Sequence, residues 1–225
     1  MVVCGHLCTS FVPWLHSPAP NQHTAPHLFQ LPFLRLAVGG RSAVALFFLI
    51  TGYVNSIGPI GRSRAGNTDA AFDGIAKSAL ARSGRMMLPT MIATALTWFM
   101  ANINAYHMTK HVDSTWIRQG WHGQEPSLGA AFKSLFQAEI GTWTKGWDDY
   151  DGTQWTLHLF LEGAMLVYTT MFATVLVKPK ARFLIYGVLY LFFWQQGEGK
   201  AHSWNFTLTG AIGANTTMQV LQSVP

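Results

Sequence analysis

Residues 31–60, LPFLRLAVGGRSAVALFFLITGYVNSIGPI, form the stretch that decides the fold. A basic, glycine-containing lead with Arg35 and Arg41 runs directly into an apolar segment at residues 43–60. The clearly polar side chains of that segment are Thr51, Asn55 and Ser56. An uncharged run of this length predicts a membrane-spanning helix, because about 20 residues are needed to cross about 30 Å of hydrocarbon.

The composition of the whole chain agrees with that prediction. Its 225 residues are 49% hydrophobic and only 11% charged, with a net charge of +5. A soluble domain usually carries about 25% charged residues, so the deficit favours an integral membrane protein. We therefore expect a lipid bilayer as the partner, at an endomembrane or the plasma membrane, and no nucleic acid.

Further apolar segments lie at residues 2–15, 86–103, 155–177, 183–194 and 206–220. Together with residues 43–60 they predict an all-α bundle of about five or six spans, forming a single domain over residues 1–225. Basic residues exceed acidic ones in the loops at 61–85 and 178–182, which predicts that these loops are cytoplasmic. Alternation then places the loops at 17–30 and 104–153 outside. The glycosylation pattern Asn205-Phe206-Thr207 is predicted on the same outer side.

The two cysteines carry little information about chemistry. Cys4 and Cys8 are four residues apart, with His6 between them, and this spacing does not build a disulfide framework. Three soft ligands in a short apolar segment are a weak metal site without a fourth partner. We interpret both cysteines as small buried hydrophobic residues and expect no metal.

Three ionisable residues fall inside predicted spans, where burying a charge in lipid costs several kcal/mol. His6 is the best candidate for a general base, because imidazole changes protonation near physiological pH. A structural histidine that hydrogen-bonds between helices is an equally good interpretation. His158 and Glu162 are four residues apart, so they share a helix face and can form a polar pair, for which we favour a structural role.

Arginines form the second group of candidates. Arg82 and Arg85 are three residues apart and precede the segment at 86–103, so they share a helix face. Their guanidinium groups suit a phosphate-bearing ligand, although cytoplasmic anchoring also explains them. Arg35 and Arg41 lie on the predicted outer side, where that anchoring does not apply. Arg41 is therefore expected to turn toward a polar cavity.

Several separated motifs, in this order, resemble the acyltransferase 3 family of integral-membrane acyltransferases, its fungal branch in particular. Residues 2–6 resemble the end of the family's first span, which closes on a histidine, and residues 31–56 resemble its basic-glycine lead and Phe-Phe-x-x-Ser/Thr-Gly-Tyr helix. Arg82-Ser-Gly-Arg85-Met-Met-Leu-Pro89 is similar to its Arg-x-x-Arg-x-x-x-Pro motif. Residues 150–165, with Tyr150-Asp151, Trp155-Thr156-Leu157 and Gly163-Ala164-Met165, resemble its Tyr-Asp…Trp-Thr-Ile/Leu…Gly-Ser-Met segment.

The resemblance implies an enzyme that moves an acyl group from an acyl-coenzyme A donor to a hydroxyl of a carbohydrate, lipid or small metabolite. It implies that His6 is the catalytic histidine. It also implies a set of residues that line or approach the donor and acceptor sites: Arg35, Arg41, Tyr53, Arg82 and Arg85. Acyl-coenzyme A would be a substrate, and no bound cofactor is expected.

The chain departs from the family pattern in two ways. The family has about ten spans, so this chain is expected to be an N-terminal portion of that fold. The family's Trp-Thr-Ile-Pro-x-Glu reads Trp155-Thr-Leu-His-Leu-Phe160 here, and Glu162 stands two positions beyond the family's glutamate. Two residues rotate a helix by about 200°, so Glu162 faces nearly the opposite way.

O-acyl transfer is the leading hypothesis that these observations support. A catalytically inactive membrane protein is the alternative, because of the shifted glutamate and the missing spans. A transporter fragment ranks last, because we find no internal repeat of the kind that transporter folds often carry.

Overall fold

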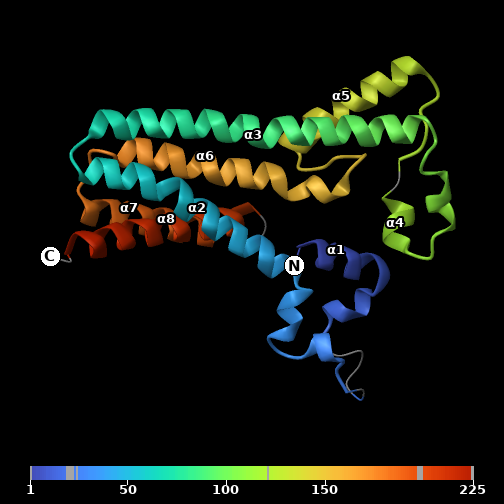
Figure 1. Ribbon diagram of the computed structural model, residues 1–225, viewed down its shortest axis with the longest axis horizontal. Helices are drawn as coiled ribbons and strands as arrows, with labels where there is room; N and C mark the ends of the chain where they lie inside the picture. Colours follow the sequence, from blue (N-terminus) through green and yellow to red (C-terminus); the bar gives the residue numbers. More distant parts are fainter. Residues whose placement is uncertain (1, 19–22, 24, 121, 197–199, 224–225) are drawn as a thin grey trace. The chain divides into compact units, whose positions relative to one another are not determined.

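The computed structural model describes residues 2–18, 23, 25–120, 122–196 and 200–223 (Figure 1). Within these residues every regular element is a helix, as predicted. The chain divides into two compact units, one of residues 1–45 and 91–154 and the other of residues 46–90 and 155–225. We call them unit 1 and unit 2. Two long helices, α2 (Gly40–Arg64) and α3 (Thr68–Asn102), contribute residues to both.

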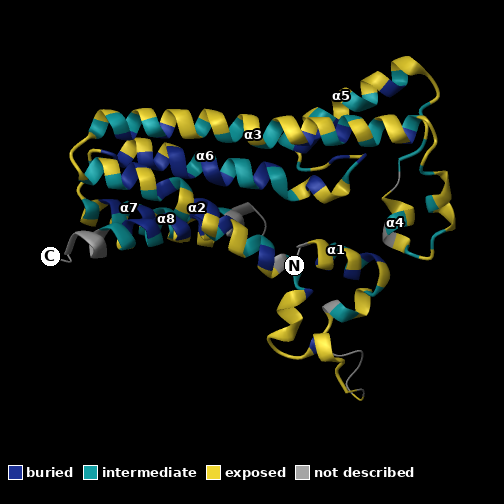
Figure 2. Ribbon diagram, viewed as in Figure 1, coloured by how far each residue is buried: buried dark blue, intermediate teal, exposed yellow. Residues whose placement is uncertain are grey.

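Unit 2 is a bundle in which parts of α2 and α3 run beside α6 (Leu157–Thr174), α7 (Pro179–Gln195) and α8 (Lys200–Ser223) (Figure 1). Its core is built mainly from small and aliphatic side chains, together with the buried rings of Tyr168 and Tyr186. The most deeply buried members are Ile60, Ala164, Val167, Tyr186 and Ala214. Figure 2 shows the buried residues on the facing sides of these helices.

The helix predicted at residues 43–60 is confirmed as the central part of α2. It packs against α8 at two glycines. A β-carbon on Gly52 would lie 1.8 Å from the carbonyl oxygen of Thr207, and one on Gly210 would lie 2.0 Å from that of Leu49. Such close backbone contact requires glycine and is typical of helix pairs in membranes.

The predicted loop at residues 61–85 is wrong over most of its length, because α3 begins at Thr68 and continues for 35 residues. Asn67 starts the helix, with its side-chain oxygen accepting a hydrogen bond from the Ala70 amide at 3.1 Å. Basic side chains do not interrupt a helix, so the charge pattern from which we predicted a cytoplasmic loop hid this one. At about 1.5 Å per residue, α3 is longer than a bilayer is thick.

Unit 1 contains α1 (Val2–Phe11), the C-terminal part of α3, α4 (Thr115–Gln119) and α5 (Leu128–Thr144), joined by four short 3-10 helices (Pro13–His16, Leu28–Gln30, Leu34–Ala37 and His107–His111). A further 3-10 helix, Gly152–Thr156, leads into α6. The predicted polar loop at 104–153 therefore contains a helix, α5, that we did not expect. Ser127 caps that helix, and Trp98 of α3 donates a hydrogen bond to the Ala131 carbonyl at 2.7 Å.

A buried carboxylate in unit 1 accepts hydrogen bonds that hold the segment after α5 against α3 and α5. Asp148 is almost fully buried and accepts hydrogen bonds from Thr94 at 2.6 Å and from the Tyr150 amide at 2.8 Å. Thr142 of α5 donates a third, at 3.3 Å. These bonds connect α3, α5 and the segment that follows α5, so Asp148 is structural.

Two helices of the described chain are long and apolar enough to cross a membrane, over Ser42–Arg64 and Gly152–Thr174. They correspond to two of the predicted spans. The structure also has helices where we predicted further spans, but they do not meet the same criteria of length and composition; α7, for example, has 17 residues.

Two smaller predictions need correction. Asn205 and Thr207 lie inside α8 with 5% and 0% of their surfaces exposed, so the glycosylation pattern is not on an accessible loop. Of the two cysteines expected to be buried, Cys8 is buried and Cys4 is exposed. The predicted loop at 17–30 lies partly outside the described residues.

Candidate functional site

A polar cluster lies among the apolar helices of unit 2, and its charged member in the described part of the chain is Arg82. The half-buried Arg82 guanidinium donates one hydrogen bond to Thr51 Oγ1 at 3.1 Å and another to Asn55 Oδ1 at 3.3 Å. Thr51 and Asn55 are one turn apart on α2, so both face α3. The fork of the guanidinium bridges that turn.

A third helix joins the cluster through Tyr168 of α6. Its hydroxyl donates to the same Asn55 oxygen at 2.9 Å. Asn55 Nδ2 and Arg82 Nε are both buried and have no hydrogen-bond partner in the described part of the chain. The cluster therefore holds two donors for which the structure shows no acceptor.

The charge of Arg82 is not neutralised within the described residues. The ion pairs found there join Lys77 to Asp73 and His122 to Glu125, and neither involves Arg82. Arginine stays protonated at neutral pH, so the cluster presents a partly desolvated positive charge. An anionic group of a ligand would complete it.

The other residues of unit 2 that were predicted to contact the donor or acceptor are not part of this cluster. Arg85 is on the same helix as Arg82 but is exposed. Tyr53 is half-buried, and its hydroxyl donates to Thr217 Oγ1 of α8 at 3.5 Å, the long end of the hydrogen-bond range. Arg82 is thus the predicted arginine that the structure places in a polar cluster.

His158 and Glu162 both lie on α6, where His158 is 6% exposed and Glu162 is half-buried. Their role as a polar pair stays a prediction. At the position of the family's glutamate, Phe160 stacks on Phe48, with ring centroids 4.0 Å apart and planes inclined by 15°. That position is aromatic and apolar here, as the shift of Glu162 along the helix implies.

A second arginine cluster in unit 2 is structural. Arg182 is 2% exposed and donates hydrogen bonds to the Thr174 carbonyl at 2.9 and 3.2 Å, and to that of Val175 at 3.3 Å. It thereby caps the C-terminal end of α6, where the helix dipole favours a cation. Nearby, Arg64 donates to the side chain and the carbonyl of Asn215.

In unit 1, His6 is half-buried on α1, beside a very close helix contact. A β-carbon on the neighbouring Gly5 would lie 2.9 Å from Gly40 Cα and 3.4 Å from the Val38 carbonyl oxygen. His6 is therefore the next residue along the chain after Gly5, where α1 contacts the start of α2. Arg41 belongs to that same start, although its side chain lies outside the described part of the structure.

Arg35 is exposed on the short 3-10 helix Leu34–Ala37. The candidate residues thus divide between the two units. His6, Arg35 and Arg41 belong to unit 1, and Tyr53, Arg82, Arg85, His158 and Glu162 belong to unit 2. Among them, Arg82 belongs to a hydrogen-bond network that connects α2, α3 and α6.

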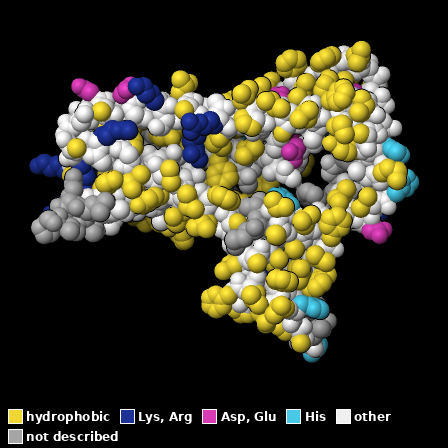
Figure 3. Space-filling view, in the orientation of Figure 1, with side chains coloured by type: hydrophobic (Ala, Val, Ile, Leu, Met, Phe, Trp, Pro, Cys, Tyr) yellow, Lys and Arg dark blue, Asp and Glu magenta, His cyan; other side chains and the backbone are white. Residues whose placement is uncertain are grey.

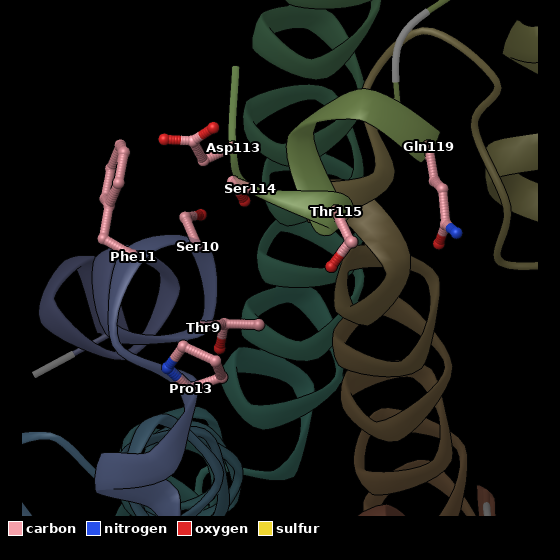
Figure 4. A pocket seen from close by; sticks show the side chains of 8 residues that line it. All are labelled: Thr9, Ser10, Phe11, Pro13, Asp113, Ser114, Thr115 and Gln119. Atoms are coloured by element: carbon pink, nitrogen blue, oxygen red, sulfur yellow. The ribbon is translucent and has the colours of Figure 1, made fainter. Parts of the chain in front are cut away.

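Unit 1 also has a cavity of about 580 Å³ between α1 and α4. One wall is formed by Thr9, Ser10, Phe11 and Pro13, and the other by Asp113, Ser114, Thr115 and Gln119 (Figure 4). The cavity was not predicted, because residues 113–119 lie in the segment at 104–153 that was predicted to be a loop.

Sequence reasoning also missed Tyr168 as a member of the Arg82 cluster. Thr51 and Asn55 did carry a signal, as rare polar side chains in an apolar helix. Their partner was hidden because Arg82 was assigned to a cytoplasmic loop. Once α3 is known to be continuous there, the pairing of these side chains follows.

The family described as an acyltransferase domain matches residues 1–214. The chain belongs to this acyltransferase family. The match confirms the resemblance to the acyltransferase 3 family, and it runs through both units. The contact of α1 with the start of α2 and the Arg82 cluster therefore both lie within the acyltransferase domain.

Among curated proteins, the chain is similar to the O-acetyltransferase PaAT-1 of Phomopsis amygdali. The two are 28% identical over 226 residues, which cover 85% of this chain and 44% of the relative. The chain thus spans less than half the length of that acyltransferase. No solved structure matches it significantly.

Proposed function

We propose that this protein is a membrane-bound O-acyltransferase. It moves an acyl group from an acyl-coenzyme A donor to a hydroxyl of a carbohydrate, lipid or small metabolite. The observation that carries the proposal is the acyltransferase family match over residues 1–214. The similarity to an O-acetyltransferase supports an oxygen atom as the acceptor.

His6 is the proposed general base. It takes the proton of the acceptor hydroxyl as that oxygen attacks the acyl carbon of the thioester. The new carbon–oxygen bond forms, the carbon–sulfur bond breaks, and the coenzyme leaves as a thiol after receiving the proton. The half-buried position of His6 on α1 supports this role, because such a site limits competing attack by water.

Arg82 is proposed to bind a phosphate of the donor. Its guanidinium is held by two neutral oxygens on α2, and no carboxylate within the described residues neutralises it. Arg85, one turn further along α3, is exposed and would meet the more distant phosphates. Tyr53, Arg35 and Arg41 are proposed as further donor or acceptor contacts.

The membrane location rests on the apolar helices. We propose about five or six spans, of which Ser42–Arg64 and Gly152–Thr174 have the strongest support. Hydrophobic side chains cover much of the face shown in Figure 3, and basic side chains gather over the N-terminal part of α3 and the turn from α2 into α3. That distribution suits helices in lipid with a basic cytoplasmic end.

A direct test is to incubate membranes that contain the chain with labelled acetyl-coenzyme A and a panel of hydroxyl compounds. We expect label to move to at least one acceptor and to stay on the donor in membranes without the chain. If the chain binds labelled donor but transfers none, the proposal fails.

That failure would favour the second candidate, a catalytically inactive family member. The stacking of Phe160 on Phe48, at the position where the family carries a glutamate, is the observation that favours it. Donor binding without transfer is therefore the result that separates the two candidates.

A further inference from the structure

The side-chain amide of Asn55 is held in one orientation by residues of two other helices. Arg82 of α3 donates to its oxygen at 3.3 Å, and the Tyr168 hydroxyl of α6 donates to the same oxygen at 2.9 Å. A guanidinium group has no acceptor, so the end of the amide that faces Arg82 has to be the oxygen. The amide nitrogen, Nδ2, is therefore the end that neither neighbour uses.

Asn55 Nδ2 and Arg82 Nε are buried donors without acceptors. Neither atom has a hydrogen-bond partner in the described part of the chain. Together they carry three N–H groups, two on the amide and one on the guanidinium. Buried N–H groups are nearly always paired in folded proteins, so an unpaired set within one cluster requires an explanation. The two side chains as a whole are only half-buried, which leaves the cluster within reach of a ligand.

The unpaired donors favour a phosphate as that ligand. A phosphate has several oxygens that accept hydrogen bonds, and its charge complements the Arg82 guanidinium, which forms no ion pair within the described residues. A neutral hydroxyl brings a donor as well as an acceptor and leaves the positive charge unbalanced. A hydrocarbon chain would leave all three N–H groups unpaired.

We propose that Asn55 is a second phosphate-binding residue beside Arg82, and that Tyr168 is the positioning residue that directs the Asn55 amide toward the ligand. The inference deepens the proposed binding of the acyl donor by Arg82, and it rests on that proposal for the identity of the ligand. Tyr168 suits this role because its side chain is 4% exposed and belongs to the packed core of unit 2, which holds the hydroxyl in place.

Binding tests the site without requiring turnover. Isothermal titration calorimetry of the detergent-solubilised full chain would use three probes: coenzyme A, pantetheine, which lacks its phosphates, and dihexanoyl phosphatidic acid, whose phosphate belongs to a lipid. We expect coenzyme A to bind at least about tenfold more tightly than the other two. The inference is overturned if neither phosphate compound binds, or if pantetheine binds as tightly as coenzyme A. Tighter binding of the lipid would overturn the assignment of the phosphate to the donor.

Two substitutions on α2 separate ligand binding from support of the arginine. Thr51→Val removes one hydrogen bond that holds Arg82 but no free donor, whereas Asn55→Ala removes such a bond and two free donors. We expect Asn55→Ala to weaken coenzyme A binding by about tenfold and Thr51→Val by about threefold or less. Asn55→Ser, which keeps a hydroxyl to accept from Arg82, should show the same loss as Asn55→Ala. Equal effects of Asn55→Ser and Thr51→Val would overturn the role of Asn55.

The role of Tyr168 is tested by a double-mutant cycle. Tyr168→Phe should weaken coenzyme A binding by about threefold, since the Asn55 amide loses one of its two fixing partners, and should leave pantetheine binding unchanged. In the Asn55→Ala background the same substitution should have no further effect. Tyr190→Phe, at a half-buried tyrosine of α7, is the matched control and should bind like wild type. An equal effect of Tyr168→Phe in both backgrounds would overturn its positioning role.

The same variants separate this inference from the proposed reaction. If wild-type chain transfers label, Asn55→Ala should raise the donor KM by about tenfold and leave kcat and the acceptor KM unchanged. Transfer with an unchanged donor KM overturns the role of Asn55 and leaves the acyltransferase intact. Coenzyme A binding that depends on Asn55, without any transfer, supports the phosphate site and counts against the reaction.

Discussion

At the scale of single residues, Arg82 combines a positive charge, partial burial and neutral partners. Its hydrogen bonds to Thr51 and Asn55 hold the guanidinium plane against α2. These bonds explain why Thr51 and Asn55 interrupt the apolar segment of α2: their side chains position the Arg82 cation. A ligand that supplies negative charge would find the arginine already oriented.

Replacing Arg82 with lysine tests this role. Lysine keeps the charge but loses the planar fork, so Arg82→Lys should raise the donor KM by about tenfold or more and leave the acceptor KM unchanged. Initial rates with labelled acyl-coenzyme A would measure it. Lys77→Gln, on the same helix but exposed and paired with Asp73, is the control and should match wild type. A donor KM that Arg82→Lys does not change would refute phosphate binding.

Glu139 of α5 gives a prediction on pH. Burial and the nearby charge of Asp148 raise the pKa of its carboxyl above the ordinary value in the folded state. The folded protein therefore holds this proton more tightly, and stability falls as pH rises from about 4.3, the unfolded value, through the raised value. Glu139→Gln should remove that part of the pH dependence and stabilise the protein at neutral pH.

Thermal unfolding of the solubilised chain between about pH 4 and pH 8 measures this effect. Asp69→Asn, an exposed acidic residue of the first turn of α3, serves as the control and should leave the pH dependence unchanged. A wild-type chain and a Glu139→Gln variant with identical profiles would contradict the assignment.

At the scale of helices, the contact of α2 with α8 depends on two glycines. Adding a methyl group at Gly52 would bring it to 1.8 Å from the Thr207 carbonyl oxygen, so the two helix backbones would have to separate. Gly52→Ala should therefore destabilise the protein by about 3 kcal/mol, at the upper end for overpacking. The free energy of unfolding in detergent, from denaturant titration, is the measurement.

Gly58→Ala on the same helix is the matched control. A β-carbon there meets nothing within 4 Å, and alanine is the better helix former by about 1 kcal/mol. The control should be as stable as wild type or slightly more so. Equal effects of the two substitutions would show that the close contact is not what makes Gly52 necessary.

The helices also show what the sequence could and could not predict. The apolar run of α2 predicted its helix because length and lack of charge are sufficient signals. The N-terminal part of α3 was missed because its basic residues were assigned to a cytoplasmic loop, although Ala71, Ile75 and Ala79 stand four residues apart on its buried face. Helix α5 was missed because it lies in the segment at 104–153, which was predicted to be a loop, and the helix start at Ser127 is a short local signal.

At the scale of the whole molecule, the family was predictable from separated motifs, and the family match confirms it. The contacts that the motif residues make with other helices could not be predicted from the sequence. Hydrogen bonds such as that from Tyr168 to Asn55 join residues more than one hundred positions apart. Periodicity and spacing describe neighbours along one element. They say little about which faces of distant helices meet.

Membrane extraction tests the proposed location of the whole chain. With about five or six spans, the chain should remain in the membrane pellet after alkaline carbonate treatment and enter solution only with detergent. A soluble marker enclosed in the same vesicles should be released. Recovery of the chain in the carbonate supernatant would contradict an integral membrane protein.

The catalytic role of His6 can be tested by removing its imidazole and measuring acyl transfer. Membranes with equal amounts of wild-type, His6→Ala or His111→Ala chain are given labelled acyl-coenzyme A and an acceptor that wild type labels. His111 is an exposed histidine of unit 1 and should be dispensable. We predict that His6→Ala loses transfer by about 10²–10⁴-fold while the control keeps it. Full transfer by His6→Ala would contradict the account.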